Sequence, residues 1–280
     1  MNQVKVITDS TAGIPSQTAQ ELGIHIVPLK IRLGSKTYRE GLDITSEEFL
    51  KRLSCKSLVP SIFPPSVADF QKIYTDLCRE GEEIISIHNS SKLSATTSSA
   101  IAAQDSLLGR CEIVVMDSML ISLGLSELVA AAARAAQEGT SLEGIVKLIR
   151  GMIPHIYIVV IGASLDYLER GRRIGHAEAF LSSMLSVKPI LILEDGDFIP
   201  MEKVRGRTRA LERLYEFIAE FPQIEKLAVL QSTSNHEVDE LVERIVLTLP
   251  SLKITKELCS PSLASLIGPG SLAIIVYEGT

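Results

Sequence analysis

The sequence predicts an α/β protein of two domains, the first a parallel sheet flanked by helices and the second a mixed α/β sheet. Short strands alternate with longer helices over the first half of the chain, and those strands are apolar throughout, which is typical of strands covered on both faces. In the second half, two strands flank the Glu-Asp-Gly-Asp segment at 194–197, which is a hairpin signal. The length of 280 residues favours two domains of roughly 150 residues each.

In the first half, each expected strand is an apolar, β-branched run, and each expected helix has apolar residues at helical spacing. Thr45 has the position of an N-cap, and Ser66 precedes an amphipathic run. The strands are expected at 4–8, 24–33, 82–87 and 111–116. The helices are expected at 15–22, 45–53, 66–80, 94–108, 120–138 and 141–150.

The pattern changes after Pro154, where strands become more frequent than helices. The strands are expected at 156–162, 187–193, 197–204, 226–231, 253–258 and 271–279. The helices are expected at 165–174, 208–221 and 237–249. We therefore place a domain boundary within 155–163 and expect the domains to be 1–158 and 159–280.

The composition argues against several classes of function. The chain carries 28 Lys and Arg against 34 Asp and Glu, a net charge of −6, and it has no Trp. Such a chain is a poor candidate for binding nucleic acid or an anionic membrane. No run approaches the ~20 apolar residues of a membrane span, and the N-terminal apolar run is too short for a signal peptide. We expect a soluble, cytoplasmic protein without stable membrane insertion.

The cysteines and histidines show no metal-binding spacing. The four cysteines include no C-x-x-C pair, which disfavours a disulfide scaffold and a zinc site; they are Cys55, Cys78, Cys111 and Cys259. Reduced thiols are expected in a cytoplasm. No metal and no cofactor are expected.

Polar residues follow three first-domain strands at the points where the strands end. Thr11 follows the first of these strands, Ser91 and Ser94 follow the next, and Ser118 follows the last. In an open parallel sheet, ligands bind at the carboxyl ends of the strands, beside helix N-termini with free N–H groups. These hydroxyls are therefore candidates for an anion site, and capping of the following helices is the structural alternative for each of them.

The sequence lacks the common motifs of nucleotide binding and hydrolysis, among them G-x-x-x-x-G-K-[ST], G-x-G-x-x-G and G-x-S-x-G. Hydroxyls, amides and helix N-termini are suited to holding an anion and not to transforming one. The leading hypothesis is a binding protein without catalytic residues. The alternative is an enzyme or phosphotransfer protein that uses His88, or Asp9 with Asp117.

Seven segments resemble the DegV family, whose members bind fatty acids for a separate fatty acid kinase. They are VITDSTAGIP at the start, YREGLDIT at 38–45, PPSVADF at 64–70, SSKLSATTSSA at 90–100, VVMDSMLISLG at 114–124, LDYLERGRRI at 165–174 and GPG at 268–270. The resemblance covers nearly the whole chain. It implies a DegV-like fold with a long-chain acid such as palmitate buried in the first domain, and a second domain that closes the site. A binder of another lipid or of a small anion, without coupling to a kinase, is the alternative within the binding class.

The resemblance also implies which residues hold the carboxylate. Ser94 matches the Ser of the family's Leu-Ser-Gly-Thr motif, and Arg173 matches the Arg of its Gly-Gly-Arg. Ile62 stands where the family has the Thr of Thr-Ser-Gln-Pro-Ser, with Phe63 after it and the Ser61 hydroxyl before it. Leu266 stands where many members carry His before Gly-Pro-Gly.

Two basic clusters stand out in this acidic chain. They comprise Arg170, Arg172 and Arg173, and Arg205, Arg207 and Arg209. One interpretation is a docking surface for an acidic partner or for a kinase that carries ATP, because the planar guanidinium group suits phosphate. The other is a solvated helix end.

Overall fold

The computed structural model describes residues 4–54, 59–78, 83–162, 187–233 and 236–279. The chain packs as two compact units, the first formed by residues 1–45 and 60–154 and the second by residues 46–59 and 155–280. The expected domains, 1–158 and 159–280, divide the chain at a single point, whereas the second of these units also includes residues 46–59. The periodicity of a helix shows which of its faces is buried, and it does not show which domain buries that face.

The first unit is built on a parallel four-stranded sheet in the order β2-β1-β6-β7. These strands are β1 (Lys5–Asp9), β2 (Ile24–Val27), β6 (Ile84–His88) and β7 (Ile113–Asp117). All positions of β6 are buried, as expected of a strand whose two faces are both covered. The register pairs Val6 with Ile24 on one side and with Ile85 on the other.

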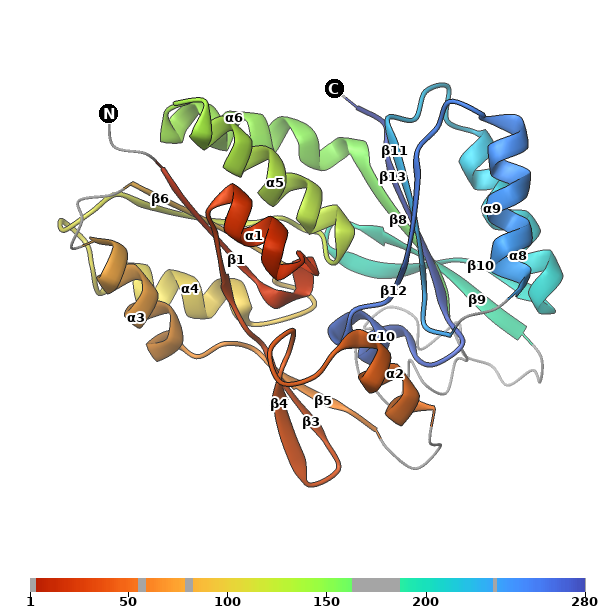
Figure 1. Ribbon diagram of the computed structural model, residues 1–280, viewed down its shortest axis with the longest axis horizontal. Helices are drawn as coiled ribbons and strands as arrows, with labels where there is room; N and C mark the ends of the chain where they lie inside the picture. Colours follow the sequence, from red (N-terminus) through yellow and green to blue (C-terminus); the bar gives the residue numbers. More distant parts are fainter. Residues whose placement is uncertain (1–3, 55–58, 79–82, 163–186, 234–235, 280) are drawn as a thin grey trace. The chain divides into compact units, whose positions relative to one another are not determined.

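Helices cover both faces of this sheet (Figure 1). The helices α3 (Val67–Cys78) and α4 (Thr96–Asp105) lie on one face, and α1 (Ser16–Leu22), α5 (Leu123–Gln137) and α6 (Leu142–Met152) lie on the other. Beneath α3 and α4, a buried cluster joins Phe70 and Tyr74 to Ile7 and Ala100. This cluster forms the core between the two helices and the sheet.

A small antiparallel sheet in the order β4-β3-β5 belongs to the same unit. It contains β3 (Lys30–Leu33), β4 (Lys36–Arg39) and β5 (Ser61–Phe63). The single strand expected over 24–33 is therefore wrong, because β2 and β3 lie in different sheets on either side of Pro28. Proline has no N–H to donate to a strand ladder, so it is a natural point for the chain to leave one sheet.

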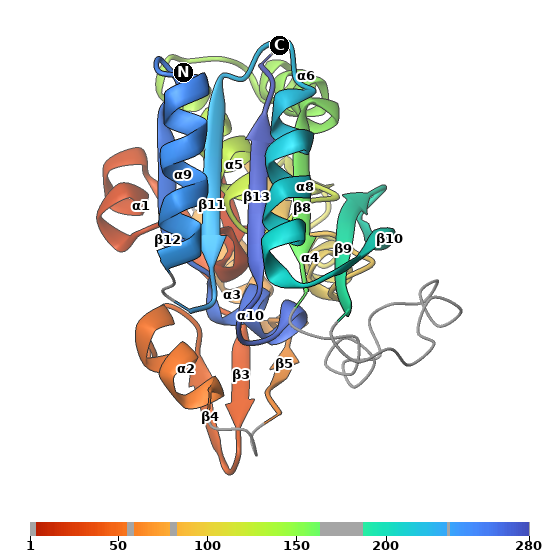
Figure 2. The same ribbon diagram turned by 90° about the vertical axis from the view of Figure 1, so that its right-hand side faces the viewer.

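The second unit contains a six-stranded mixed sheet in the order β10-β9-β8-β13-β11-β12. Of the neighbouring strands in this sheet, β11 and β12 are parallel, and the other four pairs are antiparallel. The helices α8 (Arg207–Ala219) and α9 (His236–Thr248) cover one face, as Figure 2 shows. The strands are β8 (Ile156–Ile161), β9 (Val187–Glu194), β10 (Asp197–Arg205), β11 (Lys226–Gln231), β12 (Ile254–Leu258) and β13 (Leu272–Tyr277).

Shorter elements complete the described chain. In the second unit, α2 (Ser46–Leu53) packs against α10 (Pro261–Ile267). Single 3-10 turns follow β1 and precede β8, η1 (Ser10–Ala12) and η2 (Ile153–His155). Across the described ranges, every helix is too short or too polar to traverse a bilayer.

The predicted α/β architecture is confirmed, with its parallel sheet and its separate mixed sheet. The predicted hairpin is confirmed as well: β9 and β10 are antiparallel, and Asp195 and Gly196 between them have φ angles of 48° and 83°. The strands β4 and β5 and the helix α10 were not predicted. The helix expected at 165–174 lies outside the described residues.

Cys78 and Cys111 are joined by a disulfide, with their Cα atoms 5.6 Å apart. The expectation of reduced thiols is therefore wrong for this pair. The two cysteines are 33 residues apart in sequence, and the packing of α3 and α4 beside β7 brings them together. Cys259 is a buried free thiol, and burial raises its pKa to about 12. Cys55 lies outside the described residues.

Candidate functional site

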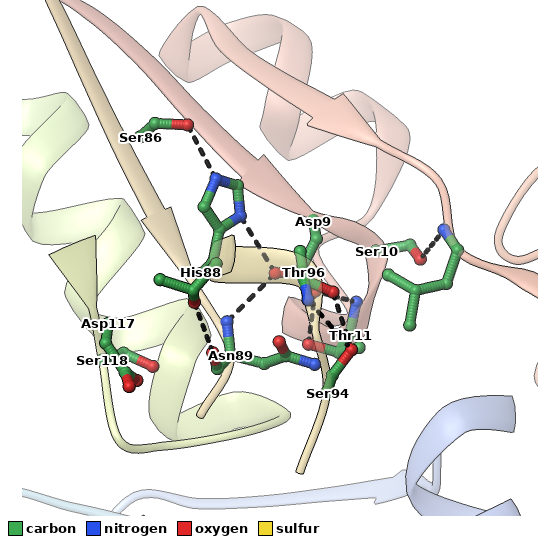
Figure 3. Close-up of polar contacts among 12 residues, drawn as sticks. Asp9, Ser10, Thr11, Ser86, His88, Asn89, Ser94, Thr96, Asp117 and Ser118 are labelled. Atoms are coloured by element: carbon green, nitrogen blue, oxygen red, sulfur yellow. Dashed lines mark hydrogen bonds and ion pairs between the residues drawn. The ribbon is translucent and has the colours of Figure 1, made fainter. Parts of the chain in front are cut away.

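The polar residues expected to converge in the first unit lie at one edge of its parallel sheet. Asp9 ends β1, His88 ends β6 and Asp117 ends β7, and His88 is paired with Asp117 in the register of the sheet. Because the strands are parallel, their carboxyl ends face the same way, and Figure 3 shows the side chains gathered there. This parallel topology is the reason why Thr11, Ser94 and Ser118, which follow these strands, are expected at the same edge of the sheet.

The carboxylate of Asp9 joins the ends of β1 and β6. Its Oδ1 accepts from the backbone N–H of Thr11 at 3.0 Å and from the Thr11 hydroxyl at 2.6 Å. Its Oδ2 accepts from the backbone N–H of Asn89 at 3.0 Å and lies 3.1 Å from Nδ1 of His88. Asp9 is fully buried, and these four contacts take the place of its hydration.

A buried chain of hydrogen bonds leads from Tyr74 to Asp9. The Tyr74 hydroxyl donates to the Ser86 hydroxyl at 2.8 Å, and the Ser86 oxygen lies 2.7 Å from Nε2 of His88. Since Ser86 accepts from Tyr74, its own proton is available to Nε2, and Nδ1–H then donates to Asp9. Burial raises the pKa of Tyr74, which keeps its hydroxyl protonated as a donor.

This Ser-His-Asp arrangement resembles a hydrolase triad in its contacts, but not in its exposure. Ser86, His88 and Asp9 all have zero exposed surface. Both ring nitrogens of His88 are occupied, and Phe70 packs edge-on against the ring with centroids 4.9 Å apart. These contacts favour a role for His88 in fixing the ends of β1 and β6.

Ser94 lies at the N-terminal end of α4 and is half-buried. Its hydroxyl is 2.8 Å from the Thr96 hydroxyl and accepts from the backbone N–H of Thr96 at 3.3 Å. The residue in the N-cap position is Ala95, which provides no side-chain hydrogen bond. After Thr96, the N–H groups of the first turn of α4 have no acceptor within the helix, and they lie beside a hydroxyl, a combination that suits an anion.

The other predicted hydroxyls are engaged in local turns. The Thr11 hydroxyl donates to Asp9, and the buried Ser118 hydroxyl bonds the backbone of Leu120 on both its N–H and its carbonyl. Ser91 is exposed, and its backbone N–H donates to Asp117 at 3.2 Å. For Thr11 and Ser118 the structural alternative, stabilisation of the local turn, has direct support.

The segment that carries Ile62 belongs to the small antiparallel sheet. Ser61, Ile62 and Phe63 form β5, in which Ile62 pairs with Ile31 of β3. Ser61 and Ile62 are half-buried, and Phe63 is exposed beneath the guanidinium of Arg32, 5.1 Å from the ring centroid. An apolar side chain at position 62 suits this strand, and it offers no donor to a carboxylate.

Two further predicted residues belong to the second half of the chain. Leu266 is buried in α10, and Ile267 separates it from the Gly-Pro-Gly turn at 268–270. Arg207 holds that turn, because its guanidinium donates to the carbonyl of Gly270 at 2.6 Å and to Glu237 at 2.7 Å. Arg173 lies outside the described residues, as do Arg170 and Arg172.

Sequence reasoning did not single out Asn89, although it directly follows His88. Asn89 is 2% exposed, and its side-chain oxygen has no hydrogen-bond partner among the described residues. Its place directly after a buried strand was the available signal. In the same described ranges, no group of His, Cys, Asp and Glu is placed to hold a metal ion.

Comparisons with known proteins identify the family. The model of the DegV family, described as uncharacterised, matches residues 3–279. A DegV domain-containing protein of Caldanaerobacter subterraneus is 37% identical over 218 residues, which are 78% of this chain and 77% of that protein.

Two solved structures share the fold at similar length. DegV of Bacillus subtilis, described as a fatty acid binding protein, is 29% identical with a TM-score of 0.89, over 99% of this chain and 100% of that one. A DegV family protein of Thermus thermophilus, whose structure is described as one of fatty acid binding, is 29% identical with a TM-score of 0.87, over all of both chains. With a family match over nearly its whole length, the chain belongs to the DegV family.

Proposed function

We propose that this protein binds a long-chain fatty acid in a buried apolar pocket and presents the carboxylate to a partner fatty acid kinase, without catalysing a reaction itself. The observation that carries the proposal is the half-buried Ser94 hydroxyl beside the first turn of α4, at the carboxyl edge of the parallel sheet. The fatty acid binding described for the proteins of Bacillus subtilis and Thermus thermophilus supports this choice of ligand.

The energy of binding comes mainly from the acyl chain. Burying roughly fifteen methylenes contributes on the order of 12 kcal/mol before entropic costs. A hydrogen bond to a charged carboxylate contributes about 1.5–3 kcal/mol. Apolar binding therefore tolerates Ile62 and Leu266 at positions where the family resemblance implies polar side chains, whereas the orientation of the carboxylate depends on the remaining donors.

The role of the carboxylate is to accept a phosphoryl group. In the proposed reaction, a carboxylate oxygen attacks the γ-phosphorus of ATP held by the kinase, and ADP leaves with the acyl phosphate formed. This protein needs no metal or cofactor of its own for that role. We place the protein in the cytoplasm, where ATP and such a kinase are available.

Extraction of the purified protein with organic solvent tests the proposal. Mass spectrometry of the extract should show about one long-chain acid per protein chain. A protein that yields no lipid, and that takes up no added palmitate, would overturn the proposed function. Hydroxylamine trapping of an acyl phosphate, formed with ATP and a candidate kinase, tests the coupling separately.

A further inference from the structure

We propose that Asn89 is a head-group contact in this protein, with its side-chain amide donating to the ligand carboxylate beside Ser94. The inference rests on the proposed function, because it takes a carboxylate at the N-terminal end of α4 as given. It assigns to Asn89 part of the role that the Ile62 side chain cannot fill.

The first observation is that the backbone of Asn89 is hydrogen-bonded whereas its side-chain oxygen is not. Its backbone is held on both sides: the N–H donates to Asp9 at 3.0 Å, and the carbonyl accepts from the Thr97 hydroxyl at 3.2 Å. Its side-chain oxygen is buried and has no hydrogen-bond partner among the described residues. Buried polar groups in native proteins are rarely left without any partner, whether that partner is protein, ordered water or a ligand.

The second observation is the direction of the side chain. In Figure 3, it extends from the end of β6 toward Ser94, Thr96 and Thr11. The hydroxyls of these residues are already engaged, Ser94 with Thr96 and Thr11 with Asp9. The amide of Asn89 therefore lies beside the candidate head-group residues, and its oxygen has no partner among the described residues.

The chemistry of the amide fits an anion. A carboxylate only accepts hydrogen bonds, and an asparagine amide provides two N–H donors that rotation of its terminal bond can turn toward the ligand. The carboxylate of Asp9 already contacts four groups of the protein, Thr11 N–H, the Thr11 hydroxyl, Asn89 N–H and Nδ1 of His88, so these groups are not available to the ligand. A neutral amide at this point attracts the head group without adding a charge.

The test compares Asn89→Leu with the unsubstituted protein, by calorimetry with hexadecanoic acid and with hexadecan-1-ol. Leucine is close to asparagine in size and makes no hydrogen bond. Affinity for the acid should fall by about 10- to 100-fold, while affinity for the alcohol should change by only a few-fold, because hydrogen bonds to charged groups are the stronger ones. The ligand-free variant should melt at a higher temperature, since the unpaired buried oxygen is gone.

Thr8→Val is the matched control. The Thr8 hydroxyl is also buried without a partner among the described residues, and it lies within β1. This substitution should raise the melting temperature and leave the ratio of acid to alcohol affinity unchanged. Asn89→Asp provides a second variant that keeps the size of the side chain; it should bind the acid at least 100-fold more weakly at pH 8 and retain the alcohol.

The outcomes separate the two proposals. If the unsubstituted protein does not bind hexadecanoic acid, the proposed function fails. If it does bind the acid, but Asn89→Leu or Asn89→Asp leaves the ratio of the two affinities unchanged, then Asn89 is only structural and the inference is wrong. A lowered ratio in both variants, with Thr8→Val unaffected, supports the assignment.

Discussion

At the scale of single residues, the site depends on buried side chains that fix the strand ends. Four donor contacts converge on Asp9, and the chain from Tyr74 through Ser86 and His88 ends there. The sequence shows Asp9 and His88 directly after two apolar runs, each at the start of a polar segment. It did not indicate their contact, because this depends on the register that sets Thr8 of β1 opposite Ile87 of β6.

We predict that Asp9→Ala lowers the free energy of unfolding by about 3 kcal/mol or more, since each buried donor left unpaired costs about 1–3 kcal/mol. Asp117→Ala is the matched control, because Asp117 also ends a strand and accepts from backbone N–H groups, but is only half-buried. Asp117→Ala should lower the free energy of unfolding by a clearly smaller amount. Urea denaturation followed by circular dichroism measures both, and equal losses would contradict the account of Asp9.

We predict that Ser94→Ala weakens fatty acid binding by about 1.5–3 kcal/mol and leaves the fold intact. The hydroxyl is half-buried, and its main protein contact is with Thr96. Calorimetry on the two proteins decides the matter, and unchanged affinity would mean that the carboxylate is held elsewhere. Conversely, Ile62→Thr adds a hydroxyl at the position where the family motif has Thr, and it should tighten acid binding if the alignment with that motif is correct.

At the scale of secondary-structure elements, the long apolar strands and the amphipathic helices were predictable, and the short polar elements were not. The strand β4 is mostly exposed and polar, so it has no clear hydrophobic pattern. The helix α10 has a cap signal, since Ser260 accepts from the N–H of Leu263 and Pro261 follows it. Its seven residues are too few to show a helical period.

The helix α3 offers a test of pH dependence at its N-terminus. The carboxylate of Asp69 accepts from the hydroxyl of Ser66 at 2.7 Å and from its backbone N–H at 2.9 Å, and these contacts hold the pKa of Asp69 below its usual value. Its stabilising effect is therefore complete above about pH 4 and is lost as pH falls through the folded-state pKa. Asp69→Asn should destabilise the protein at pH 7, and the difference should shrink below pH 4; a constant difference would contradict this.

We predict that the disulfide between Cys78 and Cys111 contributes about 3–4 kcal/mol, because it closes a loop of 33 residues in the unfolded chain. Cys111→Ser, or reduction with dithiothreitol, should lower the urea midpoint accordingly. Reduction of the Cys111→Ser variant is the control, and it should have no further effect. A thiol reagent should label Cys259 only after unfolding, since it is fully buried.

At the scale of the whole molecule, the distribution of surface charge should determine how fast a partner kinase associates. Of the second basic cluster, Arg207 is committed to Glu237 and Gly270, whereas Arg205 and Arg209 are exposed. Reversal of Arg205 and Arg209 to Glu should slow association with a partner kinase strongly at low salt and leave the lipid content unchanged. Arg134→Glu, an exposed reversal on α5, should do neither. Loss of lipid, or normal kinase turnover, would contradict the docking interpretation.

The packing of α2 against α10 has a consequence for synthesis on the ribosome. The apolar residues Phe49, Leu50 and Leu53 are buried in the finished protein, yet α10 begins only at Pro261. A nascent chain therefore carries α2 uncovered while most of the protein is translated. Chains stalled before residue 261 should be cleaved by protease within 46–53, and completed chains should resist. Because residues 46–59 belong to the second unit and residues 60–154 to the first, a single cut in the chain cannot yield both units intact.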